Sequence, residues 1–186
     1  MITMKNIIAI LGTNADYSHN RMVLTFMKEH FSEQASIEVI EISEFPMFKV
    51  SKNTETPKSI LALSEKIEQS DGVIFATPEY DHTITAALKS VIEWLSFQVH
   101  PLEKKPVMIV GASYGVQGTV RAQSHLREIL DSPGVNAHVL FGNEFMLGNA
   151  KDKFDYEKGL TCVKSTDFLE QCFKNFLDFV NLHVID

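Results

Sequence analysis

The chain has 186 residues, 45% of them hydrophobic, and a formal net charge of −7 at pH 7. This acidic balance argues against nucleic acid as a partner, because binding to phosphate backbones requires clustered lysine and arginine. No apolar run approaches the roughly 18 residues of a membrane span, and residues 1–5 lead into a strand without the layout of a signal peptide. We therefore expect a single domain over residues 1–186, located in the cytoplasm and not in a membrane.

Apolar runs typical of buried strands alternate with stretches of helical periodicity along the chain. The predicted strands cover residues 6–11, 37–42, 72–76, 107–110 and 135–141. The predicted helices cover residues 21–31, 58–69, 85–97, 120–130 and 167–182. Two stretches rich in turn-forming residues, 45–57 and 142–164, are predicted to be loops or short extra turns rather than linkers between domains.

This alternation predicts an α/β fold with right-handed crossovers and a parallel sheet covered on both faces. Two doubly wound strand orders are compatible with it, the flavodoxin-like order 2-1-3-4-5 and the dinucleotide-binding Rossmann order. The first strand is followed by Gly12-Thr13-Asn14-Ala15-Asp16, which is not the G-x-G-x-x-G sequence of the Rossmann fold. We therefore predict a flavodoxin-like doubly wound sandwich with a five-stranded parallel sheet in the order 2-1-3-4-5.

The chain has two cysteines, Cys162 and Cys172, both in its last quarter. Their spacing matches no zinc-binding pattern. We expect both to be small apolar core residues of a reduced protein. No metal site is predicted.

The loop after the first strand, residues 12–20, leads into a helix whose first turn presents free N–H groups and the positive end of its dipole. Thr13, Ser18 and Asn20 add hydroxyl and amide groups there, and His19 lies between the last two. Such a combination suits a phosphate. The alternative is that Ser18 or Asn20 only caps the helix, and this loop alone does not decide between the two.

The loop after the third strand, residues 78–83, contains Pro78, Glu79, Tyr80 and Asp81. It lies at the carboxyl end of a central strand, where ligands bind in open α/β sheets. An aromatic side chain beside rigid backbone amides suits a flat, hydrogen-bonding ligand such as a flavin ring. An ordinary turn with Thr83 as the N-cap of the next helix is the alternative. We expect His82 and His19 to be exposed loop residues rather than metal ligands.

The loop after the fourth strand, residues 111–119, is rich in glycine. Its candidate ligand contacts are Ser113, Tyr114, Gly115 and Gly118, because glycines allow close approach of the backbone and the loop amides can donate hydrogen bonds. In the predicted order, strands one, three and four are adjacent. The three loops then converge on one crevice, and this convergence predicts a ligand site more strongly than any single loop does.

Other catalytic layouts are missing from the sequence. There is no G-x-S-x-G nucleophile elbow and no G-x-x-x-x-G-K-[ST] phosphate loop, and neither cysteine lies in a candidate loop. Ile84, Leu88, Val91 and Leu95 follow one helix face and are predicted to be core. Trp94 lies off that face, so we expect it to contact a partner subunit, to cover the ligand pocket or to cover the edge of the core.

The three loops resemble those of the NAD(P)H-dependent FMN reductase family of flavodoxin-like proteins, which also includes quinone, azo-dye and chromate reductases. The family's first loop, G-S-x-R-x-x-S-x-N, matches residues 12–20, with Ala15 in place of the arginine. Its second motif, P-E-Y-N followed by L-K and D-W-L, matches residues 78–95, with Asp81 in place of the asparagine and His82-Thr83 in place of Gly-Ser. Its third, G-x-x-G-G-x-R-A-x-x-x-L-R, matches residues 115–127.

This resemblance implies bound FMN, with its phosphate in the first loop and its ring between the second and third. The implied contacts are Thr13, Ser18, His19, Asn20, Pro78, Glu79, Tyr80, Asp81, Ser113, Tyr114, Gly115 and Gly118. It also implies hydride transfer from NAD(P)H through FMN to a flavin, quinone, azo or similar acceptor, with no catalytic side chain because the cofactor carries the chemistry. A homodimer or homotetramer is implied as well. Ala15 predicts weaker FMN binding than is usual in the family.

Two alternatives remain open at the level of sequence. One is a flavodoxin-like electron carrier that binds FMN but does not oxidise NAD(P)H. The other is a non-enzymatic scaffold that keeps the fold, since fold alone does not determine function.

Overall fold

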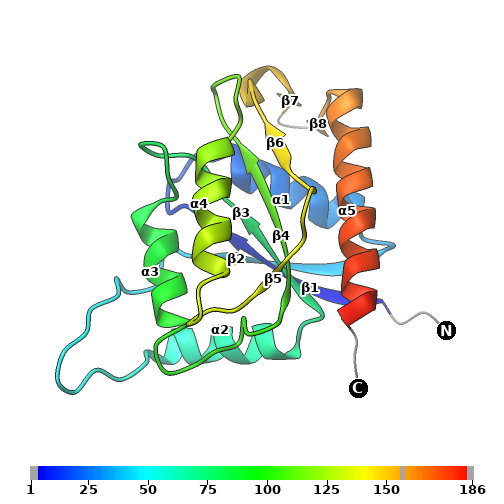
Figure 1. The fold of residues 1–186 in the computed structure, drawn as a ribbon. Coiled ribbons are helices and arrows are strands. Elements are labelled where there is room, and N and C mark those ends of the chain that lie inside the picture. The colour runs from blue at the N-terminus through cyan, green and yellow to red at the C-terminus, as the bar shows by residue number, and fades with distance from the viewer. Residues whose placement is uncertain (1–3, 156–157, 184–186) are drawn as a thin grey trace.

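The computed structural model describes residues 4–155 and 158–183. Its main sheet is parallel and runs in the order β2-β1-β3-β4-β5, with β6 also paired to β4 (Figure 1). The strands are β1 Lys5–Leu11, β2 Ala35–Glu41, β3 Gly72–Ala76, β4 Pro106–Ala112, β5 His138–Val139 and β6 Phe145–Leu147, and a small antiparallel hairpin consists of β7 Phe154–Asp155 and β8 Gly159–Leu160. This order confirms the predicted flavodoxin-like fold.

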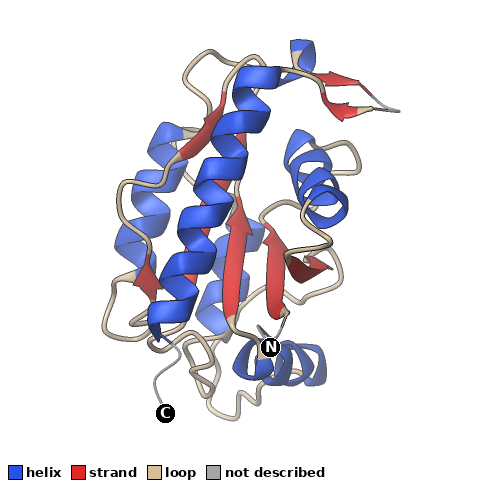
Figure 2. Cartoon of the chain, turned by 90° about the vertical axis from the view of Figure 1, so that its right-hand side faces the viewer, coloured by secondary structure: helices blue, strands red, loops and turns tan. Residues whose placement is uncertain are grey.

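In the part of the chain that the structure describes, five α-helices cover the two faces of the sheet, and a short 3-10 helix, η1 Ala150–Asp152, precedes the hairpin. The α-helices are α1 His19–His30, α2 Lys58–Gln69, α3 Ala86–Trp94, α4 Val120–Leu130 and α5 Val163–His183. One hydrophobic core packs α1 and α5 against the sheet, and a second packs α2, α3 and α4 against the opposite face. Figure 2 shows α5 running along its face of the sheet. Every residue of β3 and β4 is buried, which explains their uninterrupted apolar sequences.

The predicted bounds of α2, β3 and α4 agree with the structure. Helix α1 begins two residues earlier than predicted, because Ser18 is its N-cap and its Oγ accepts a hydrogen bond from the Arg21 amide at 3.3 Å. Helix α5 begins four residues earlier than predicted and follows Cys162 directly. Cys172 is buried as predicted, whereas Cys162 is partly exposed, so the prediction of a core position for Cys162 is wrong.

The fifth strand is shorter than predicted. The sequence predicts one continuous strand over residues 135–141, whereas β5 covers only His138–Val139. Within this run only β5 pairs with the first part of β4. The chain then leaves the sheet over residues 140–144 before β6 pairs with the end of β4. Gly142 has a φ of 62°, which suits the sharp departure. The side-chain amide of Asn143 holds the detour, because its Nδ2 donates to the Cys172 carbonyl of α5 at 3.0 Å. The detour brings β6 alongside Ala112, where β4 ends and the third loop begins.

Trp94 is covered by its own chain. Its Nε1 donates to the Pro46 carbonyl at 2.9 Å, and its ring lies edge-on to Phe48 with 4.8 Å between ring centroids. Only 4% of Trp94 is exposed, so it covers the edge of the core and gives no support to a partner surface.

No helix within residues 4–155 and 158–183 combines the length and the apolar character needed to cross a membrane.

Candidate functional site

The three loops form the walls of a cavity of about 620 Å³ at the carboxyl ends of β1, β3 and β4. All the predicted contact residues except Thr13 line it. The wall also contains six residues that were not predicted as contacts, namely Tyr17, His82, Ala112, Val116, Gln117 and Arg121. His82 is exposed, as expected, and Arg121 belongs to the third family motif, which was the signal that could have identified it. The structure thus brings the predicted residues together, while their binding of a ligand stays a prediction.

Thr13 lies behind the wall and joins the first two loops. It is 1% exposed, and its Oγ1 accepts a hydrogen bond from the Ala15 amide at 3.2 Å. The same Oγ1 lies 3.5 Å from the Tyr80 hydroxyl. Thr13 therefore fixes the shape of the first loop and the position of Tyr80.

The first turn of α1 offers backbone amides rather than side chains to the cavity. Ser18 Oγ is engaged as the N-cap, so the capping role proposed for it is confirmed. The Asn20 side chain is buried and pairs with the backbone of Ala112, donating to its carbonyl at 3.0 Å and accepting from its amide at 2.9 Å. The His19 and Asn20 amides have no acceptor within the helix, as is general for a first turn, and so form an anion-binding N-terminus.

The second loop forms a tight hairpin at its tip. The amides and carbonyls of Tyr80 and Thr83 bond each other at 2.9 and 3.0 Å, and Asp81 and His82 occupy the left-handed region with φ values of 48° and 65°. Such a pair of positive φ angles is typical of two-residue hairpin turns. Thr83 is therefore not the N-cap of α3. That position belongs to Thr85, whose Oγ1 accepts from the Leu88 amide and donates to the Gly12 carbonyl at 2.8 Å.

Glu79 ties the second loop to helix α4. Its carboxylate accepts hydrogen bonds from the amides of Arg121 at 3.0 Å and Ala122 at 3.3 Å, and it lies 3.4 Å from the Arg121 guanidinium. The N-cap residue of α4, Thr119, makes no side-chain capping bond, so Glu79 satisfies the first turn from another loop.

The third loop is held from behind and open at the front. The amides of Ser113 and Gly118 donate to the carbonyls of Leu147 and Gly115. A Cβ added at Gly115 would meet nothing closer than Ser113 Oγ at 3.9 Å, so this glycine borders open space. Within the described ranges, the amides of Asp81 and Tyr114 have no acceptor and remain available to a ligand.

His19 is 6% exposed, so the expectation of an exposed loop residue is wrong. Its ring lies edge-on to Tyr17 and Tyr114, at 5.3 and 4.9 Å between centroids, and its Nε2 is 3.4 Å from the Tyr17 hydroxyl. These aromatic neighbours keep water away, and burial lowers the pKa of His19 below its ordinary value of 6.5.

We expect His19 to make the fold less stable in mild acid. Its pKa is lower in the folded chain than in the unfolded one, so the unfolded state binds the proton first. The contribution of His19 is therefore fully present above the ordinary pKa of 6.5 and is lost as the pH falls below it. Urea unfolding from pH 7.5 to 5.5 should show a smaller loss of stability for His19→Gln than for the unchanged chain. His82→Gln, which removes an imidazole at an exposed position, is the control.

No cluster of three or more histidine, cysteine or acidic residues able to hold a metal ion occurs among the residues that the structure describes.

Comparison with known proteins identifies the family. The model of the NADPH-dependent FMN reductase family matches residues 5–152. A NADH:(hydroxy)cinnamate reductase subunit from Vibrio ruber is 45% identical over 177 residues, which cover 95% of this chain and 88% of that protein. A NADH-dependent flavin reductase subunit 2 from Lactobacillus johnsonii is also 45% identical, over 94% of this chain and 96% of that protein.

The flavoenzyme NAD(P)H:(acceptor) oxidoreductase from Paracoccus denitrificans has the same fold. Its structure superposes with a TM-score of 0.86 at 23% identity and covers 97% of this chain and 99% of that one. Fold, motifs and family model agree. The chain belongs to the NADPH-dependent FMN reductase family and is an oxidoreductase that passes hydride from NAD(P)H through FMN to an acceptor.

Proposed function

We propose that one FMN binds in the cavity formed by the three loops and that the residues lining this cavity hold it. The observation that carries the proposal is the convergence of all three loops on one cavity of about 620 Å³, within the usual range for small-molecule sites. The proposed contacts are Ser18, His19, Asn20, Pro78, Glu79, Tyr80, Asp81, Ser113, Tyr114, Gly115 and Gly118, with Thr13 supporting them from behind.

The donor groups of the cavity fit FMN. An anion fits the N-terminus of α1, where the His19 and Asn20 amides point out of the helix. A flat ring that accepts hydrogen bonds fits between the second and third loops, which offer the amides of Asp81 and Tyr114. Gly115 lines the cavity and leaves space for the ring, because a Cβ there would meet nothing closer than Ser113 Oγ at 3.9 Å.

Bound FMN would supply the redox chemistry by taking hydride from NAD(P)H and passing it on. The residues of this chain position it and stabilise charge. The Asp81 and Tyr114 amides would donate to the polar edge of the ring, and Tyr80, which is 49% exposed, would flank the ring while leaving room for the donor and acceptor. Glu79 contributes indirectly, because it fastens this loop to α4.

We also propose NADH as the donor, because the names of both 45%-identical relatives specify NADH. The acceptor would be a small molecule such as a flavin or a quinone. We propose that the chain is a single domain located in the cytoplasm. That compartment contains NADH, and its reducing conditions keep cysteines unpaired, as both cysteines are here. We propose that the chain forms a homodimer, with a homotetramer as the alternative. The description of both relatives as subunits supports an assembly of more than one chain.

The decisive experiment combines a visible spectrum with anaerobic reduction. The protein loaded with FMN should lose its flavin absorbance when mixed with NADH in a stopped-flow instrument, faster than with NADPH. A bound flavin that neither nucleotide reduces would favour an electron carrier, and protein that binds no added FMN would favour a scaffold.

Gly115→Val provides the matched variant for this experiment. Its side chain would fill open space rather than clash with the fold, since the nearest atom to a Cβ is 3.9 Å away. FMN binding should therefore be lost while the unfolding midpoint stays close to that of the unchanged chain. Retention of FMN by this variant would place the flavin elsewhere.

A further inference from the structure

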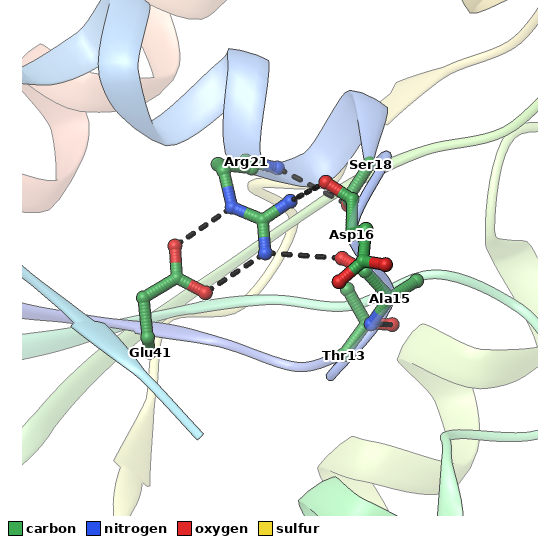
Figure 3. A network of polar contacts seen from close by, with 6 residues as sticks. All are labelled: Thr13, Ala15, Asp16, Ser18, Arg21 and Glu41. Carbon is green, nitrogen blue, oxygen red and sulfur yellow. Dashed lines mark hydrogen bonds and ion pairs between the residues drawn. The ribbon is translucent and has the colours of Figure 1, made fainter. Parts of the chain in front are cut away.

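Arg21 makes an unusually complete set of contacts at the base of the first loop. Its Nε and Nη2 donate to the two carboxylate oxygens of Glu41 at 2.7 and 2.9 Å, a bidentate ion pair with the end of β2. Its Nη1 donates to the Asp16 carbonyl at 2.9 Å, and its Nη2 also donates to the Ala15 carbonyl at 3.0 Å. Figure 3 shows the guanidinium lying between Glu41 on one side and the loop on the other.

These contacts fix the direction of the loop's peptide groups. In a trans peptide the C=O and the following N–H point to opposite sides. Because the carbonyls of Ala15 and Asp16 point toward Arg21, the amides of Asp16 and Tyr17 point away from it. Tyr17 and Ser18 line the cavity, whereas Arg21 does not.

Arg21 itself lines a separate hollow together with Met22, Phe26 and Phe154. Its guanidinium therefore acts on the cavity through the loop. Glu41 also balances its charge, so the pair adds little net positive potential to attract a phosphate. The effect of the pair on a phosphate would be geometric. The pair holds the partly negative carbonyl oxygens of Ala15 and Asp16 on its own side of the loop. The partly positive N–H groups of Asp16 and Tyr17 therefore face the opposite side.

We propose that Arg21, held by Glu41, is the positioning residue that gives this chain its selectivity for the phosphorylated flavin, FMN, over riboflavin. This inference rests on the proposed FMN site with its phosphate at the start of α1. Ala15 leaves the loop without a cationic side chain at the position where the resembling proteins have arginine. A loop of preset shape then supplies through backbone groups what a guanidinium would otherwise supply directly.

The test is calorimetric titration of FMN and riboflavin into the unchanged chain, Arg21→Ala, Arg21→Lys, Glu41→Gln and Lys66→Ala. Arg21→Ala should weaken FMN about tenfold or more and riboflavin less than about twofold. Arg21→Lys should not restore FMN affinity, because one ammonium group cannot span a carboxylate and two carbonyls. Glu41→Gln, the milder variant, should weaken FMN by a smaller factor in the same selective way.

Lys66→Ala is the matched control. Lys66, on α2, pairs with Glu38, which lies on β2 like Glu41, and this pair does not touch the first loop. The variant should leave both affinities unchanged. The 31P resonance of bound FMN should shift toward that of free FMN in Arg21→Ala, an effect that a general loss of stability would not produce.

Four results would overturn the inference while leaving the FMN site intact. Full rescue by Arg21→Lys, or tighter FMN binding in Glu41→Gln, would mean that Arg21 acts through its charge. Equal weakening of both flavins in Arg21→Ala would mean a general structural role. Unchanged affinities in Arg21→Ala would mean no role in binding. If the unchanged chain binds neither flavin, the proposed function fails, and this inference fails with it.

Discussion

Replacing Gly111 by alanine should destabilise the fold by about 3 kcal/mol, the upper part of the usual range for overpacking. A Cβ at this position in β4 would lie 1.8 Å from Thr119 Oγ1 and 2.9 Å from the Thr77 carbonyl oxygen. Thr119 is fully buried directly before α4, and its Cβ would also lie 2.9 Å from the added atom. Rotation of its hydroxyl therefore does not relieve the clash, and we expect the start of α4 to shift. Glu79 is bonded to the first turn of α4, so the shift should also reach the second loop and weaken FMN binding.

Urea unfolding with and without FMN measures both effects. Gly134→Ala is the control, since a Cβ there would meet nothing within 4 Å, and its stability should change by less than about 0.5 kcal/mol. The double variant Gly111→Ala/Thr119→Gly should recover part of the loss. A Gly111→Ala protein as stable as the unchanged chain would show that α4 adjusts freely, and that the third loop is not fixed by this contact.

Replacing Asn20 by alanine should cost about 2–4 kcal/mol of stability, because it leaves a buried amide and a buried carbonyl of Ala112 without partners. The lost pair of bonds also joins the first loop to the third. Affinities for FMN and riboflavin should therefore fall together, in contrast to the selective effect expected at Arg21. Thermal or urea unfolding together with titration of both flavins tests this.

Two further variants bracket the Asn20 result. Asn20→Asp keeps one acceptor oxygen but loses the donor and adds a buried charge, so it should be no more stable than Asn20→Ala. Asn175→Ala removes an exposed side-chain amide that donates to Asn143 Oδ1 at 3.1 Å and accepts from Gln171 Nε2 at 2.8 Å, and it should cost less than about 1 kcal/mol. A fully stable Asn20→Ala protein would mean that water replaces the side chain at Ala112.

The sequence predicted the sheet order and the location of the cavity because both depend on strong local signals. Fully apolar strands such as β3 and helices with a clear apolar face such as α2 identify themselves by periodicity. Once the order 2-1-3-4-5 is assumed, the loops after β1, β3 and β4 must meet at one edge of the sheet. That geometry predicts which loops form the cavity wall. It does not predict every contact that individual residues make within them.

Features that depend on tertiary contacts were beyond the sequence. Residues 135–141 have the composition of a strand, but only His138–Val139 among them pair with β4. The Asn143 side chain, bonded to Cys172 of α5, holds the chain out of the sheet before β6. His19 looks like a loop residue, yet Tyr17 and Tyr114 enclose it. The partner of Arg21 is 20 residues away, on the next strand, and only the β1–α1–β2 crossover brings the two together.

The detour between β5 and β6 has a consequence for how copies of this protein can associate. An unbroken exposed edge strand is a template on which another chain can add a strand, and this leads to aggregation. Here one edge of the sheet is interrupted at residues 140–144. The opposite edge, β2, carries Glu38 and Glu41, each held in an ion pair. Because both edges are poor templates, a dimer of this chain should form through its helical faces and not as one continuous sheet.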